Sequence, residues 1–285
     1  MGLPMAARLL HAGYPVAAWN RTRAKADPLA ALGAEVTETP AEAVRSANII
    51  ITMLEAGPIV MQVAEAALPG MLSGALVIDM SSTRQSEAEE LHALLTGRGI
   101  GFIDAPVSGG VLGAQAGTLA IMAGGSAKDF KRAEPVLQVM GRPTLVGAPG
   151  CGQLAKLCNQ LIVGGTIGIV AEALLLAQAG GADPAAVRAA IRSGFAESRI
   201  LEVHGQRMLE RNFVPGGQVK SQTKDMENIL IAAGNAGLSL PMTSLVADLY
   251  RSILGAFPNA DQAAALLALE QQNAGKRLGA APDKF

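Results

Sequence analysis

Lys156, Asn159 and Gln160 are the residues whose types and spacing most readily suggest chemistry. They occur at i, i+3 and i+4 of a helical pattern, so they share one helix face. Lys156 is set among apolar residues, and no further charge follows until Glu172. Desolvation would lower the pKa of such an ammonium group towards a range that suits proton transfer. The alternative is a lysine whose apolar stem packs on the protein while its ammonium group reaches solvent.

Two loops that follow predicted strands carry groups suited to binding anions. In residues 104–110, Ser108 and the backbone N–H groups of Gly109 and Gly110 could hold a carboxylate, although a plain glycine-rich turn fits equally well. In Asn20-Arg21-Thr22-Arg23 there is no acidic residue to take a ribose hydroxyl. Arginine and threonine suit a 2′-phosphate, which favours NADP over NAD, and the alternative is a solvated turn.

The elements that must position these groups fall into two sets. Up to residue 147, short apolar runs alternate with helical patterns, which predicts a doubly wound α/β domain with a parallel sheet. After residue 152 only helical patterns follow, so we expect a dinucleotide-binding domain over 1–149 and an all-helical substrate and dimerisation domain over 150–285. The predicted strands are 16–19, 48–53, 75–80 and 101–105. The predicted helices are 4–12, 40–45, 59–67, 87–96, 154–178, one starting at Pro184 behind Asp183, 200–210, 223–236, 241–254 and 260–273.

Composition excludes several classes of protein. The 285 residues are 50% hydrophobic and 16% charged, with a net charge of -1 and 3% aromatics, which argues against nucleic-acid binding. The two cysteines and three histidines have no metal-ligand or redox spacing, so we expect a reduced, cytoplasmic protein without a metal. Residues 161–182 are long enough to span a membrane, but Glu172 near their middle favours a helix buried in a soluble protein.

The first helical pattern begins at once, without a preceding strand. A doubly wound nucleotide fold needs a strand and a glycine-rich turn there, and Gly2 matches only the third glycine of such a turn. We expect a start codon assigned too late. Otherwise the domain lacks a central strand and dinucleotide binding suffers, which would leave an inactive truncated homologue. Upstream codons and a fluorescence titration with NADPH would discriminate between the two.

Several motifs in a fixed order resemble the β-hydroxyacid dehydrogenase family (3-hydroxyisobutyrate dehydrogenase-like) over essentially the whole chain. The matching segments are residues 1–5, 79–82, 104–110, 117–119, 152–160, 194–205, 213–216 and 224–225. The resemblance implies a Rossmann-type sheet, whose first strand is missing from this sequence, followed by an all-α domain built on a long central helix.

The resemblance also implies roles for individual residues. It makes Lys156 the proton donor or acceptor, and it raises the catalytic interpretation above the solvated one. It implies substrate binding by Ser108, Gly109, Gly110, Asn159 and Gln160. It implies cofactor binding near Gly2, Asn20, Arg21, Thr22, Met53, Leu54 and Lys224.

The resemblance implies reduction of a short aldehyde- or keto-acid of the tartronate semialdehyde type, and the turn at 20–23 favours NADP over NAD as the cofactor. The alternative substrates are 3-hydroxyisobutyrate, succinic semialdehyde and glyoxylate, and retention of Lys156 argues against imine reduction. Glu55 and Ala88 depart from residues common in the family, which bears on the substrate more than on the chemistry. The long apolar helix suggests a homodimer or homotetramer, with no nucleic-acid or membrane partner.

Overall fold

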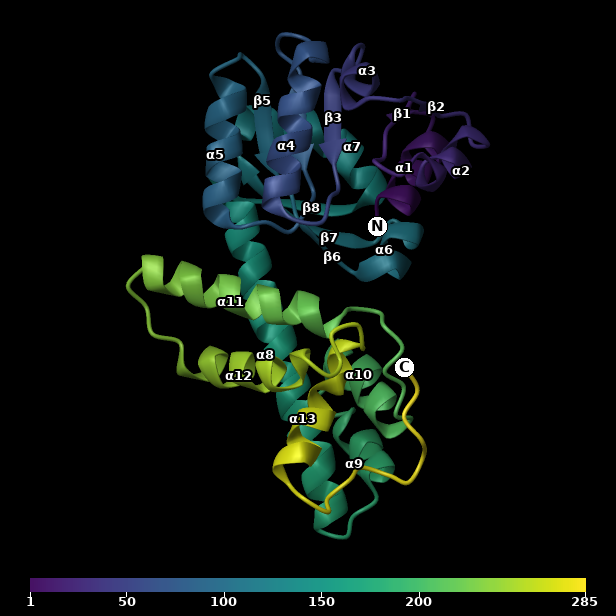
Figure 1. Ribbon diagram of the computed structural model, residues 1–285, viewed down its shortest axis with the longest axis vertical. Coiled ribbons are helices and arrows are strands. Elements are labelled where there is room, and N and C mark those ends of the chain that lie inside the picture. Colours follow the sequence, from purple (N-terminus) through teal and green to yellow (C-terminus); the bar gives the residue numbers. More distant parts are fainter. The chain divides into compact units, whose positions relative to one another are not determined.

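Two units, Met1–Lys156 and Leu157–Phe285, make up the computed structural model, which describes residues 1–285 (Figure 1). The first unit is α/β and the second is helical, so the predicted fold class is confirmed. The boundary between the units lies inside a helix, α8 (Cys151–Ala179), which starts in the first unit, within the glycine-rich segment 147–152.

The first unit is built on a six-stranded sheet in the order β3-β4-β5-β7-β6, with β8 paired to β7. Strands β3, β4 and β5 are parallel, β7 is antiparallel to β5 and to β6, and β8 is parallel to β7. The sheet is therefore parallel only over part of its width. The strands are β3 (Ile49–Thr52), β4 (Leu76–Asp79), β5 (Gly101–Asp104), β6 (Val107–Ser108), β7 (Leu119–Gly125) and β8 (Gly141–Gly147).

The three parallel strands are short apolar runs, of which β4 and β5 are covered on both faces while β3 is half-buried. Every residue of β4 is buried, and three of the four in β5 are buried. All four predicted strands occur, each one or two residues shorter than predicted, with the first reduced to β1 (Ala17–Ala18). That strand pairs in parallel only with β2 (Glu35–Val36), so the two form a sheet separate from the six-stranded one.

Four helices of this unit occur where the apolar periodicity predicts them, at residues 2–11, 40–44, 57–67 and 85–96, and three others, at 27–30, 110–116 and 127–140, were not predicted. Helix α3 begins with a capping box in which Thr39 and Glu42 each satisfy a backbone N–H group of the other, and Ser126 caps α7. The helices of this unit are α1 (Gly2–His11), α2 (Asp27–Ala30), α3 (Pro40–Val44), α4 (Gly57–Ala67), α5 (Gln85–Thr96), α6 (Gly110–Ala116) and α7 (Ala127–Met140).

The second unit contains helices and no strand longer than an isolated bridge. Asp183 caps α9 by accepting from the backbone N–H group of Ala185, with Pro184 in the first turn, as predicted. Helices α11 and α12 lie side by side in Figure 1 and are packed together. The predicted helix 260–273 begins instead as a 3-10 turn, Gln262–Ala264, capped by Asp261. The helices are α9 (Pro184–Ile191), α10 (Arg199–Leu209), α11 (Val219–Asn235), α12 (Pro241–Leu254) and α13 (Ala265–Gln272).

Helix α8 is long and apolar enough to cross a membrane by length and composition alone. Only 39% of its most apolar stretch lies buried in the protein, which is less than a fully buried core helix would show. Three apolar side chains spaced seven residues apart, Ile162, Ile169 and Leu176, are 63%, 58% and 73% exposed. Seven residues make two helical turns, so these three side chains share one face of the helix.

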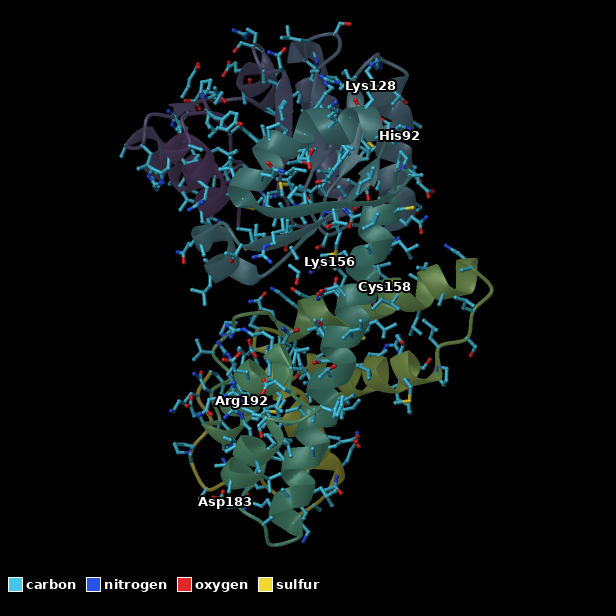
Figure 2. All side chains as sticks on the ribbon, turned by 180° about the vertical axis from the view of Figure 1, so that it is seen from behind. His92, Lys128, Lys156, Cys158, Asp183 and Arg192 are labelled. Carbon is cyan, nitrogen blue, oxygen red and sulfur yellow. The ribbon has the colours of Figure 1, made fainter.

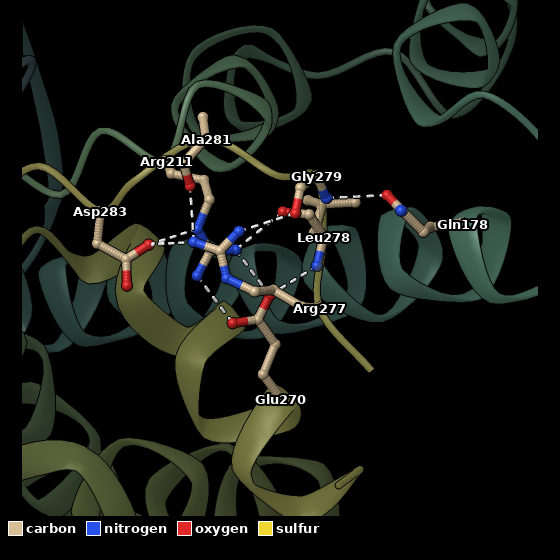
Figure 3. A network of polar contacts seen from close by, with 8 residues as sticks. All are labelled: Gln178, Arg211, Glu270, Arg277, Leu278, Gly279, Ala281 and Asp283. Carbon is tan, nitrogen blue, oxygen red and sulfur yellow. Dashed lines mark hydrogen bonds and ion pairs between the residues drawn. The ribbon is translucent and has the colours of Figure 1, made fainter. Parts of the chain in front are cut away.

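A buried arginine anchors the C-terminal segment of the second unit (Figure 3). Arg211, which is 1% exposed, donates to both carboxylate oxygens of Glu270 over 2.7 and 2.9 Å, to the Leu278 carbonyl oxygen and to Asp283. It is also the only non-glycine residue with a positive φ, 50°. The Arg211 carbonyl oxygen accepts from the Lys284 backbone N–H group, and the Phe213 N–H group donates to the Lys284 carbonyl oxygen, so one side chain and two backbone hydrogen bonds hold the segment in place.

Candidate active site

Three polar residues end the three parallel strands side by side. The register pairs Thr52 of β3 with Asp79 of β4, and Asp79 with Asp104 of β5. In open α/β sheets, ligands bind outside this carboxyl edge, in the loops that follow the strands. The predicted cofactor residues Met53 and Leu54 directly follow β3 and therefore lie at this edge.

Asp79 organises the first part of this edge. Its carboxyl accepts from the Thr52 hydroxyl over 2.7 Å and from the Ser81 backbone N–H group over 3.1 Å. The Ser81 hydroxyl in turn accepts from the Leu54 backbone N–H group over 2.8 Å. Burial raises the pKa of Asp79, and the hydrogen bonds from Ser81 and Thr52 oppose this rise only in part. The loop after β3 is therefore fixed to the loop after β4.

Asp104 connects the same edge to the start of α8. Its carboxyl accepts from the backbone N–H groups of Gly150 and Gln153, each over 2.8 Å. Burial raises the pKa of Asp104 to about 7, although these two hydrogen bonds favour the charged form. The Gln153 side chain donates to the Ser81 carbonyl oxygen and accepts from the Thr83 backbone N–H group.

Lys156 follows Gln153 by three residues on α8, so it lies about one helical turn beyond the carboxyl edge. It is half-buried, and Figure 2 marks it on this helix together with Cys158. The predicted partners Asn159 and Gln160 lie on the same continuous helix, as the i, i+3, i+4 spacing requires. Lys156 therefore lies on the predicted long helix, and the structure adds that this helix begins at the carboxyl edge of the sheet.

The predicted carboxylate loop also adopts a conformation that suits anions. Ser108 ends the short strand β6 and is half-buried, and Gly109 and Gly110 are exposed. Both glycines have a positive φ, 133° and 63°, which only glycine adopts readily. Backbone N–H groups in such left-handed turns can converge on an anion.

In the second unit, Asn159 and Gln160 connect α8 to α11. Asn159 donates to the Gln160 side chain over 2.8 Å, and Gln160 donates to the Asp225 carboxylate over 2.8 Å. Lys224 lies beside the same carboxylate, with Nζ 3.4 Å from Asp225 Oδ1. Asp225 and Gln222, which also bonds Gln160, were not among the predicted site residues.

The remaining predicted cofactor residues lie at two places in the first unit. Gly2 begins α1, and no side chain caps the start of this helix. Gly2 lies close to Met53, because a Cβ atom added to Gly2 would be 3.8 Å from the Met53 Cβ. The backbone N–H groups of an uncapped helix start suit a phosphate, so this region fits a dinucleotide. Asn20, Arg21 and Thr22 form an exposed turn after β1, in which Thr22 donates its backbone N–H to the Asn20 side chain.

Two acidic residues do lie close to that turn, although both are outside the segment 20–23. Glu38, just after β2, forms an ion pair with Arg23, which also lies 3.5 Å from Asp27. In this ion pair the Arg23 guanidinium is already bound to a carboxylate, and the charge of Glu38 is partly neutralised. Arg21, which is exposed, is then the arginine best placed to meet a 2′-phosphate.

The ionisation of Asp104 has a consequence for stability. Between the ordinary pKa of 3.8 and about 7, the folded protein keeps a proton on Asp104 that the unfolded chain has released. This contribution to stability is fully present below the lower value and is lost as pH rises through the higher one. We expect urea unfolding from pH 5 to pH 8 to show a smaller loss of stability with rising pH in Asp104→Asn than in the wild type. Parallel pH profiles for the two proteins would contradict this assignment.

His204 has a structural partner. Its Nδ1 lies 3.3 Å from Asp261 Oδ1, and Asp261 also accepts from the backbone N–H groups of Gly216, Gly217 and Ala263. These contacts hold the turn before α11 and lower the pKa of Asp261 against the effect of its burial. No group of three or more His, Cys, Asp or Glu side chains is arranged to hold a metal ion.

Comparisons with known proteins match both units to NAD-binding dehydrogenases. The family model described as the NAD binding domain of 6-phosphogluconate dehydrogenase matches residues 1–154. The model described as NAD-binding of NADP-dependent 3-hydroxyisobutyrate dehydrogenase matches residues 150–269. The chain is 40% identical over 256 residues to 2-hydroxy-3-oxopropionate reductase of Escherichia coli. This alignment covers 88% of this chain and 87% of that protein.

Solved structures of similar proteins match over almost the whole chain. Mycobacterium tuberculosis 3-hydroxyisobutyrate dehydrogenase with L-serine matches with a TM-score of 0.87 and 32% identity, covering 94% of this chain and 95% of that one. Psf3 in complex with NADP+ and 2-OPP matches with a TM-score of 0.83 and 25% identity, covering 94% and 96% of the two chains.

Proposed function

This chain belongs to the β-hydroxyacid dehydrogenase family, and from that membership we propose that it reduces a short aldehyde- or keto-acid of the tartronate semialdehyde type. It is an NAD(P)-binding oxidoreductase. The observation that carries the proposal is that α8 begins at the carboxyl edge of the parallel strands and has Lys156 one turn further on. An ammonium group in that position is suited to protonating a substrate held where dinucleotides bind.

In this proposal Lys156 supplies the proton of the reduction. Bound NADPH supplies the hydride that reduces the carbonyl carbon. As the C=O π bond breaks and negative charge develops on oxygen, the Lys156 ammonium donates a proton there, and the hydroxy acid forms. In the reverse direction the neutral amine accepts the same proton. A preorganised ammonium group stabilises the developing charge more strongly when water is excluded.

The substrate carboxylate is assigned to Ser108, Gly109 and Gly110. The Ser108 hydroxyl can donate to an anion, and the positive φ values of the two glycines orient backbone N–H groups in a way that side-chain-bearing residues would resist. The amide groups of Asn159 and Gln160 are assigned to orienting the rest of the substrate. Gln160 is already held in place by Asp225.

A substrate panel tests the proposal. Tartronate semialdehyde, succinic semialdehyde and glyoxylate are reduced with NADPH and with NADH, and 3-hydroxyisobutyrate is assayed in the oxidising direction. We expect the highest kcat/KM with tartronate semialdehyde and NADPH. A clear preference for one of the other acids would change the proposed substrate but not the proposed type of reaction. Failure with every acid would overturn the proposal.

Cofactor preference is assigned to the turn after β1. We expect Arg21→Ala to raise KM for NADPH about 10-fold, because a charge-assisted hydrogen bond to the 2′-phosphate is lost, while KM for NADH stays unchanged. Arg98→Ala is the matched control, because Arg98 is exposed and lies before the amino end of β5, away from the carboxyl ends of the strands. An equal change in KM for NADPH and for NADH in Arg21→Ala would show that Arg21 does not bind the 2′-phosphate.

The exposed apolar face of α8 supports a homodimer or homotetramer. We propose that Ile162, Ile169 and Leu176 are covered by a second copy of the chain, because an apolar stripe of this length is unfavourable in water. We expect Ile169→Glu to reduce the molar mass measured by light scattering to that of the monomer. Leu32→Glu, an exposed apolar position in the first unit, should leave the mass unchanged. A monomeric wild type would contradict the proposal.

A further inference from the structure

The start of α8 is capped by a residue far away in the sequence. Helices begin with backbone N–H groups that lack a partner within the helix, and the side chain just before the helix usually satisfies one of them. Here that position is Gly150, which has no side chain. Asp104 of β5 takes over, because its two carboxyl oxygens accept from Gly150 and Gln153 separately.

Gln153 supplies a second attachment. Its side chain is 0% exposed, and both ends of its amide are used, with Nε2 2.8 Å from the Ser81 carbonyl oxygen and Oε1 3.0 Å from the Thr83 backbone nitrogen. An apolar side chain of similar size would fill the same space without these bonds. A buried amide that meets two backbone groups at once fixes position and rotation together.

Close backbone packing supplies a third attachment. A Cβ at Gly152 would lie 2.4 Å from the Asp104 carbonyl oxygen and 2.5 Å from the Met122 carbonyl oxygen. A Cβ at Gly124 would lie 2.6 Å from the Gly152 nitrogen. The first turn of α8 therefore rests directly on the backbone of β5 and β7, and it cannot shift without breaking the hydrogen bonds of Asp104 and Gln153.

We infer that Gln153, together with Asp104, is a positioning residue that fixes where the Lys156 ammonium group stands during proton transfer. The inference rests on the proposed role of Lys156. Lys156 follows Gln153 by three residues on the same rigid helix, so any rotation of the first turn moves its ammonium group directly. A misplacement of about 1 Å can cost about 100-fold in rate.

Kinetics of Gln153→Met test this inference, because methionine keeps the volume of glutamine and removes both hydrogen bonds. We expect kcat to fall about 10- to 100-fold and KM for NADPH to stay within about twofold. The solvent deuterium isotope effect on kcat should rise, because proton transfer from a misplaced ammonium group becomes slower than the other steps. Gln178→Ala is the matched control, since Gln178 lies near the other end of α8 and accepts from the Gly279 backbone N–H group.

A second measurement does not depend on any substrate. The rate at which an amine-reactive reagent modifies Lys156, followed by mass spectrometry over a range of pH, reports the surroundings of its ammonium group. We expect the midpoint of this profile to move in Gln153→Met and to stay unchanged in Gln178→Ala. A fall in kcat with unchanged isotope effect and unchanged labelling would reduce Gln153 to a structural role and overturn the inference, as would an unchanged kcat. If the wild type reduces none of the acids, the proposed function fails, while the labelling profile still decides on Gln153.

Discussion

We expect Lys156→Ala to lower kcat for reduction of tartronate semialdehyde about 100-fold or more, because the proton donor for the developing alkoxide is removed. KM for NADPH should change little, since no residue assigned to the cofactor is altered. Steady-state rates of NADPH oxidation over a range of substrate concentrations provide both constants. A small primary amine added to the solution should restore part of the lost rate in this variant.

Two further variants sharpen the result for Lys156. Lys156→Arg keeps the positive charge but holds its proton too tightly to donate it, so we expect a loss close to that of the alanine variant. Lys131→Ala, on an exposed face of α7, should behave like the wild type. If the arginine variant retained most of the activity, the role of position 156 would be electrostatic and proton donation would come from another group.

The largest effect on stability is expected at Arg211. We expect Arg211→Met to lower the free energy of unfolding by about 3–5 kcal/mol, because Glu270 and Asp283 lose their shared cation. The Leu278 carbonyl oxygen loses a donor as well, so the C-terminal segment loses its main attachment (Figure 3). Urea unfolding followed by circular dichroism measures the change.

The same cluster supplies the control for this prediction. Arg277 also contacts Asp283, but its side chain is 40% exposed, and exposed ion pairs contribute about 0–1 kcal/mol. Arg277→Met should therefore change stability by less than about 1 kcal/mol. Similar losses for the two variants would show that the segment is held by its backbone pairing and apolar contacts instead of by the buried arginine.

The apolar runs and helical periodicities of the sequence were sufficient to predict most elements of the fold. Strands β3, β4 and β5 occur where continuous apolar runs predict them, and Asp183 caps α9. Strand β8 was missed because it contains Gly141 and Pro143, which disfavour strands, and Leu145-Val146 is its only apolar run. Helix α7 was missed too, since Pro135 lies inside it and interrupts the usual helical signal.

The spacing of residues along the helix was sufficient to propose Lys156 as the catalytic residue. It could not predict the residues that hold the start of α8 in place. Lys156 and Asn159 are close in sequence, and a single helix brings them to one face. Asp104 and Gln153 are 49 residues apart, and their contact depends on the sheet register and on the path of the chain through β7 and β8. One signal was available, because each of the three parallel strands ends on a polar residue at the edge where ligands bind.

The most direct test of the account is single-turnover reduction of tartronate semialdehyde by the wild type with NADPH, after fluorescence titration has established that the nucleotide binds. The account predicts saturable NADPH binding and oxidation of one NADPH for each hydroxy acid formed, with a rate that collapses in Lys156→Ala. Binding of NADPH without any oxidation, or equal rates in the wild type and Lys156→Ala, would contradict it.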